Sequence, residues 1–210
     1  MPWLSSRTGK PIDLVEPTSA QVDFADLAWS LAHTNRHAGN GDRQASVAAH
    51  ILIGLPLATG PLRALWLLHG AEVARLGDVP EQAMEALSAL AAGFGARHAA
   101  SFAWVWTEYR ARHAKVIHAA AGVEMPTSAQ LVALQSIASI VEATERRDLH
   151  NPALRPEPRW SGAQPANRVA RQRPADQVAD ALHEEWKASL PALARPASPI
   201  AIPPSRRRRA

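Results

Sequence analysis

Hydrophobic residues recur along the first half of the chain at the three- and four-residue spacing of amphipathic helices. This pattern predicts helices over 23–35, 46–55 and 61–74. Asp23 and Ser46 stand at the start of the first two segments, and both residue types cap helix N-termini by accepting backbone N–H groups. The inward-facing stripes comprise Phe24, Leu27, Ala28 and Leu31; Val47, His50, Ile51 and Gly54; and Leu62, Leu65, Trp66, His69 and Val73.

The same reasoning extends the helical pattern to most of the remaining chain. A helix opening after Pro80, a long one near 95–120 and another near 127–148 follow, separated by turns that contain glycine and proline. Within 175–190, apolar residues return every four positions, which predicts one more amphipathic helix. We therefore expect an all-α fold, a bundle of about six core helices with one C-terminal helix packed on it.

Composition divides the chain into three parts. Residues 1–150 form the predicted helical domain, and 151–190 are expected to be an irregular connection followed by the C-terminal helix. Residues 191–210 contain five prolines, show no periodicity and end in arginines, so we expect a disordered basic tail.

The composition and the apolar segments of the chain exclude several classes of site and protein. The 210 residues are 47% hydrophobic, enough for a core, and contain no cysteine, so disulfides, thiolate metal sites and cysteine nucleophiles are ruled out. The longest apolar stretch, roughly 47–74, is interrupted by Pro56, Pro61 and Arg63 and does not resemble a membrane span. The N-terminal residues lack the apolar segment of a secretion signal. We expect a cytoplasmic protein without membrane contact.

Positive charge is concentrated near the C-terminus. Residues 1–150 carry 12 Lys and Arg against 14 Asp and Glu, whereas 151–210 carry 11 against 5. Arg206, Arg207, Arg208 and Arg209 supply four of these charges. The basic tail is either a solvated segment or the source of a weak, salt-sensitive contact with nucleic acid.

Two histidines, His50 and His69, interrupt otherwise apolar stripes on consecutive predicted helices. A single histidine on such a face is usually a core residue, but two of them followed by "LGDVP" indicate a site. The surrounding blocks are "GKPIDLVEP" (9–17), "NR" (35–36), "SVAAH" (46–50), "LLHGAEVARLGDVP" (67–80) and "EATERRDLH" (142–150). Their order and spacing resemble the HD-domain metal-dependent phosphohydrolases, in particular the branch of bacterial 5'-deoxynucleotidases, over about residues 5–150.

The resemblance implies a divalent metal (Mn, Co, Zn or Mg) held by two histidines and two aspartates. His50 and His69 match the histidine ligands, Arg36 matches an arginine that contacts substrate phosphate, and Asp78 matches the acid of "LGD", an acid/base or water-positioning group. The departures from the family pattern concern the acidic residues: Gly70 and Ala138 stand where the aspartate ligands are expected, and Val73 stands where a glutamate is expected.

These departures change the expected function. Two imidazoles alone lack both the charge and the coordination number of a hydrolytic metal site. We expect a divergent nucleotide phosphohydrolase-like protein in which metal-dependent hydrolysis of (deoxy)nucleotides is impaired or lost. A working site would need replacement ligands, and Glu72, Asp78, His33 and His37 are the candidates. The alternative is a catalytically inactive protein that binds a nucleotide or another small phosphate ligand, or that regulates an active paralogue or assembles with its own copies.

Overall fold

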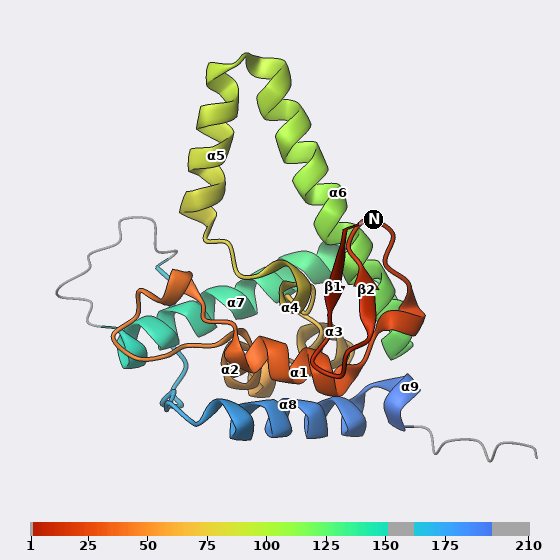
Figure 1. Cartoon of the computed structure of the whole chain (residues 1–210). Helices are drawn as coiled ribbons and strands as arrows, with labels where there is room; N and C mark the ends of the chain where they lie inside the picture. Colours follow the sequence, from red (N-terminus) through yellow and green to blue (C-terminus); the bar gives the residue numbers. More distant parts are fainter. Residues whose placement is uncertain (1, 151–161, 195–210) are drawn as a thin grey trace, which may run out of the picture.

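Residues 2–150 and 162–194 are described by a computed structural model, shown in Figure 1. At the N-terminus, β1 (Trp3–Ser5) and β2 (Pro11–Asp13) form an antiparallel hairpin in which Leu4 lies opposite Ile12. The α-helices are α1 (Phe24–His33), α2 (Val47–Gly54), α3 (Leu62–Leu67), α4 (Val73–Leu76), α5 (Glu81–Gly93), α6 (Ala96–Ala121), α7 (Ser128–Leu149), α8 (Ala175–Ser189) and α9 (Pro191–Ala194). Short 3-10 turns occur at η1 (Ser19–Gln21), η2 (His37–Gly39) and η3 (Leu55–Leu57). The expectation of an all-α fold is confirmed.

Helix boundaries follow the capping residues of the sequence. The Asp23 carboxylate accepts the backbone N–H groups of the first turn of α1, and the Ser46 hydroxyl accepts the Ala49 N–H at 3.2 Å. Thr127 and Gln130 form a capping box at the start of α7. At the other end of a helix, Gly122 adopts a left-handed φ of +69° directly after α6, a conformation that glycine reaches without steric cost.

The helix predicted over 61–74 was wrong as a single element. The structure divides it into α3 and α4, with a turn between them in which Gly70 has a φ of +69°. A left-handed glycine ends a helix because the next N–H groups no longer reach the carbonyls four residues earlier. His69 and Gly70 therefore lie in a turn rather than on a continuous helical stripe.

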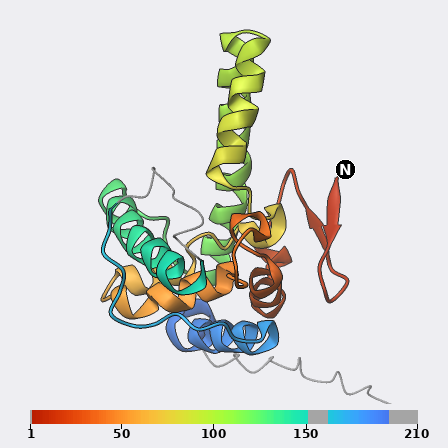
Figure 2. The ribbon, with the colours of Figure 1, turned by 90° about the vertical axis from the view of Figure 1, so that its left-hand side faces the viewer.

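The body of the fold packs around two buried tryptophans. Trp66 on α3 donates its indole N–H to the Ile51 carbonyl at 2.8 Å, and Trp186 on α8 donates to the Leu67 carbonyl at the same distance. The Trp186 ring also meets the Phe24 ring edge-on, with centroids 5.4 Å apart. Helix α8 runs beneath α1 and α2 (Figures 1 and 2). The C-terminal helix α8 therefore packs against the body.

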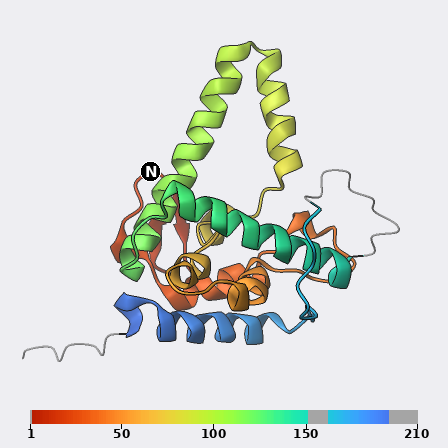
Figure 3. The same cartoon turned by 180° about the vertical axis from the view of Figure 1, so that it is seen from behind.

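Helices α5 and α6 form a hairpin that rises away from this body (Figures 1 and 3). No residue of α5 is buried, and Leu90 and Phe94 near the tip are 66% and 79% exposed. Only the second half of α6 enters the core, where Ile117 and Ala121 are fully enclosed. None of the helices in the described ranges is long and apolar enough to cross a lipid bilayer.

The C-terminal part of the chain differs in one respect from expectation. Residues 191–194, assigned to a disordered tail, form the short helix α9, whose first turn bonds back to the Leu190 carbonyl. The segment 162–174 is irregular. The rest of the predicted tail and the first part of the predicted connection lie outside the described residues.

Candidate functional site

A fully buried glutamate, Glu145, lies at the centre of the candidate site. The inner stripe of α7 runs through Leu134, Ile137, Ala138 and Val141 and continues to Glu145 at the next four-residue step. A carboxylate on an apolar stripe must find partners inside the protein, because burial without them is costly. Sequence reasoning missed Glu145, although the residue lies within the block "EATERRDLH". Its place on the stripe was the signal that could have revealed it.

Glu145 binds groups from two other segments of the chain. Its Oε1 atom lies 3.1 Å from Nδ1 of His50 on α2, and its Oε2 atom lies 3.3 Å from Nε of Arg36. The Nε2 atom of His37 is 3.8 Å from the same oxygen. Arg36 also reaches Glu142, one turn earlier on α7, at 3.5 Å. Arg36 and His50, which were predicted from the sequence as site residues, are thus brought together by Glu145, which was not predicted.

The surrounding charges and burial determine the protonation states of Glu145 and His50. Burial alone would raise the pKa of Glu145, but the His50 ring and the Arg36 guanidinium lower it, so the carboxylate is ionised. Burial, and then the Arg36 charge, lower the pKa of His50. A carboxylate only accepts hydrogen bonds, so Nδ1 of the neutral ring carries the proton. The lone pair of His50 is consequently on Nε2.

His69 lies next to His50 but does not join the hydrogen-bonded group. Its ring stacks on Trp66 with centroids 4.8 Å apart and an interplanar angle of 10°, and its centroid is 6.2 Å from that of His50. Burial, with the nearby His50 and Arg36, lowers the pKa of His69 to about 3. Both histidines are therefore neutral near pH 7.

Asp78 holds the loop that carries Arg36. Its Oδ2 atom accepts the backbone N–H of His37 at 3.1 Å. His37 and the following Ala38 have φ values of +57° and +53°, a left-handed conformation that is unfavourable for residues other than glycine. The carboxylate thus stabilises a strained turn beside the buried group. The structure places Asp78 at the site, and its catalytic role stays a prediction.

The donor set does not match the metal site that the resemblance implies. Gly70 and Ala138 offer no ligand atom. Glu72 is paired with the Arg110 guanidinium, and Nδ1 of His33 bonds the Trp29 carbonyl at 2.8 Å. Among residues 2–150 and 162–194, no three His, Asp or Glu side chains are gathered in a way that could hold a metal ion. His50 and His69 alone do not supply the coordination of a hydrolytic metal.

Arg36 is among the residues that line a polar cavity of about 340 Å³. Most of the lining comes from the loop 35–45, and His150, directly after α7, completes it. Arg36, Arg43, His37 and His150 contribute nitrogen donors, and Asp42 is the only acidic residue among the described residues that line it. We call this the loop cavity. Its size and polarity suit a small anion rather than an apolar ligand.

Comparison with known proteins adds no assignment: neither the models of known protein families nor the curated protein sequences give a match to this chain. The resemblance of its motifs to the HD-domain phosphohydrolases therefore stays a prediction.

Proposed function

We propose that this chain is a divergent protein of the HD-domain, deoxynucleotidase-like type that binds a phosphate group of a (deoxy)nucleotide without hydrolysing it. One observation carries the proposal. Glu145 ties together Arg36 and His50, residues that the resemblance assigns to phosphate and metal, while the positions of both aspartate ligands hold residues without a donor atom. The two carboxylates that would hold a metal are therefore absent, whereas the Arg36 guanidinium, which would bind phosphate, is present.

The loop cavity supports the phosphate part of the proposal. Arg36 contacts the ionised Glu145 and also lines the cavity, and Arg43 adds a second guanidinium that is exposed to solvent. Guanidinium groups recognise phosphate oxygens through paired, charge-assisted hydrogen bonds.

One observation favours the alternative, a rearranged phosphohydrolase. Histidines that bind metals commonly donate their second N–H to a carboxylate, as His50 does to Glu145. His50 would then offer Nε2 to a metal, and a ligand from outside the described ranges would have to complete the site. The two functions differ in whether metal and turnover accompany nucleotide binding.

The test is calorimetric titration of the full chain with deoxynucleoside mono- and triphosphates in EDTA, followed by phosphate-release assays with Mn²⁺ or Co²⁺. We expect binding in EDTA and no release of phosphate. Arg43→Gln should weaken binding about tenfold, since it removes a charge-assisted hydrogen bond from the exposed wall. Arg97 is an exposed arginine near the start of α6, and Arg97→Gln is the matched control, which should bind like the wild type.

Three results would count against the proposal. Absence of nucleotide binding in EDTA would remove the binding function, and equal losses for Arg43→Gln and Arg97→Gln would show non-specific charge attraction. Turnover with stoichiometric metal that disappears in His69→Ala would establish the enzyme instead.

A further inference from the structure

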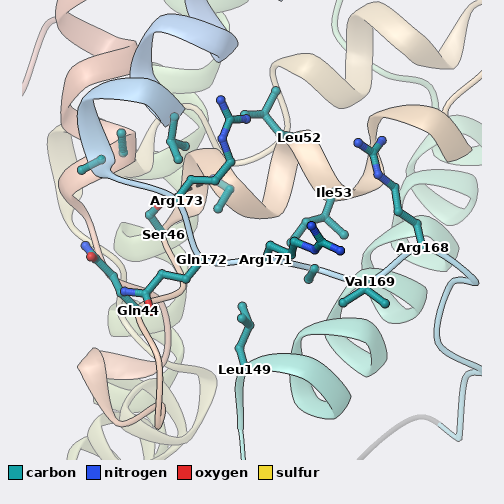
Figure 4. Close-up of a pocket in the computed structure, with 15 residues that line it drawn as sticks. Gln44, Ser46, Leu52, Ile53, Leu149, Arg168, Val169, Arg171, Gln172 and Arg173 are labelled. Carbon is teal, nitrogen blue, oxygen red and sulfur yellow. Dashed lines mark hydrogen bonds between the residues drawn. The ribbon is translucent and has the colours of Figure 1, made fainter.

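A second and larger cavity, of about 560 Å³, lies between α2, the end of α7, the segment 168–173 and the start of α8 (Figure 4). Its floor is aliphatic and comes from three helices, through the side chains of Ala49, Leu52, Ile53, Leu149 and Val178. None of the described residues that line it is aromatic or acidic. We call it the arginine-rimmed cavity.

Three arginines stand on one wall of this cavity within six residues. Figure 4 shows Arg168, Arg171 and Arg173 around Leu52 and Ile53. Within the described part of the chain, the guanidinium groups of Arg168 and Arg171 form neither an ion pair nor a hydrogen bond, and Arg173 meets only the Gln177 carbonyl at 3.4 Å. Clustered guanidinium groups without acidic partners beside an apolar floor form a site for an anion that also has an apolar part.

The wall that carries the arginines is fixed to the fold. The Ala170 N–H donates to the Asp148 carboxylate at 2.7 Å, and the Ala166 N–H donates to the Thr144 hydroxyl at 2.8 Å. Arg147 bonds the carbonyls of residues 166 and 168 from the same face of α7. Because the segment is held at several points, the backbone positions of the three arginines are already fixed, and binding needs to order only their side chains.

We propose that the arginine-rimmed cavity binds a small amphipathic anion, with an aliphatic chain on the floor and a carboxylate or phosphate head at Arg168, Arg171 and Arg173. The absence of aromatic residues from its described lining favours an alkyl chain over a nucleobase, because bases bind by stacking. The two cavities share Gln44 in their linings but are built from different charged residues. The proposal therefore does not depend on nucleotide binding at the loop cavity.

The experiment is calorimetric titration of the full chain with decanoate and decyl phosphate, each below its micelle-forming concentration. Two compounds serve as controls. Decyltrimethylammonium has the same alkyl chain with a cationic head group, and inorganic phosphate is an anionic head group without an alkyl chain. We expect both anions to bind at least about tenfold more tightly than the cation or inorganic phosphate. A preference between decanoate and decyl phosphate identifies the source of the ligand, a fatty acid or a phosphorylated lipid, and either preference supports the proposal.

Two kinds of variant distinguish recognition of the anionic head group from recognition of the alkyl chain. Arg168→Gln combined with Arg171→Gln should weaken binding of both anions at least tenfold, whereas Arg97→Gln, on the distant hairpin, should not. Ala49→Phe fills the floor while leaving the rim intact, and it should abolish binding of decanoate. Circular dichroism establishes that each variant is folded.

Four results would overturn the proposal: no binding of either anion to the wild type, equal affinity for the cationic detergent, an equal loss in Arg97→Gln, or unchanged decanoate binding by folded Ala49→Phe. Nucleotide titration of the same variants keeps the two sites distinguishable, since none of these substitutions changes a residue that lines the loop cavity.

Discussion

The imidazole of His50 and the carboxylate of Glu145 meet in the interior of the protein, with Nδ1 and Oε1 3.1 Å apart, although the two residues are 95 positions apart in sequence. Glu145 is completely enclosed and His50 almost so. Because Arg36 contacts the second carboxylate oxygen, α2, α7 and the loop before α2 are joined through one ionised side chain. The same contacts orient His50 and hold Arg36 at the edge of the loop cavity.

Removing the charge of Glu145 should strongly destabilise the fold. Glu145→Gln leaves the Arg36 guanidinium largely buried without its principal counter-charge, and breaking such a pair from one side costs about 3–5 kcal/mol. Urea denaturation at pH 7.5 measures this loss. Glu142→Gln is the matched control on the same helix, because Glu142 also contacts Arg36 but its side chain is 41% exposed. We expect the control to lose less than about 1 kcal/mol, and equal losses would contradict the central role of Glu145.

Gly54 should not tolerate even a methyl group. A Cβ atom placed there would lie 2.2 Å from a ring carbon of Trp66 and 2.8 Å from a methyl carbon of Val141. We expect Gly54→Ala to lower the free energy of unfolding by roughly 1–3 kcal/mol through overpacking. Gly93→Ala, at the end of α5, is the control. Its Cβ would meet no atom within 4 Å, so the higher helix propensity of alanine should leave stability equal or improved. Thermal unfolding should therefore show a lowered Tm for Gly54→Ala and an unchanged or raised Tm for Gly93→Ala.

The stability of the protein should fall as the pH drops below about 6.5. The folded-state pKa of His69 is lowered from 6.5 to about 3, so the unfolded chain binds a proton in this interval that the folded chain does not. Stability is therefore fully present above pH 6.5 and decreases toward pH 3, with up to about 1.4 kcal/mol per pH unit from each such histidine. The lowered pKa of His50 acts in the same direction.

His69→Phe isolates the contribution of this histidine. Phenylalanine keeps a ring for stacking on Trp66 but cannot bind a proton. Urea denaturation at pH 7.5, 6.5 and 5.5 should give a shallower decrease for the variant than for the wild type. If the free energy of unfolding falls equally with pH in both proteins, His69 has the same pKa in the folded and unfolded chain, and the prediction is wrong.

Restoring the two aspartates should restore metal binding if the resemblance is correct. A side chain at position 70 has open space around its Cβ, and aspartate tolerates the left-handed φ of +69° better than most residues. A carboxylate at position 138 would be buried and should destabilise the metal-free protein. We expect excess Co²⁺ to raise the Tm of the Gly70→Asp, Ala138→Asp double variant by roughly 5–10 °C.

Asparagine at both positions is the appropriate control, since it has nearly the same shape without the charge. The wild type and the asparagine variant should show no shift with Co²⁺. Should the aspartate variant fold and remain insensitive to metal, the assignment of positions 70 and 138 as ligand positions would be wrong.

Local signals in the sequence determined most of the helices. Asp23, Ser46 and Thr127 are found at the helix starts where their side chains satisfy free N–H groups, and Gly122 ends α6. These signals act between residues three or four apart, so they can be read along the chain. The division between α3 and α4 was missed because an apolar stripe does not show that Gly70 takes a positive φ.

The sequence also determined that His50 faces the interior, because periodicity specifies which side of a helix is apolar. It did not determine which atoms His50 and His69 meet. The pairing of His50 with Glu145, the stacking of His69 on Trp66 and the arginine-rimmed cavity depend on how segments far apart in sequence pack together. Only the tertiary structure decides these contacts, since the free energy of a buried charge depends on its neighbours in space and not on its neighbours in the chain.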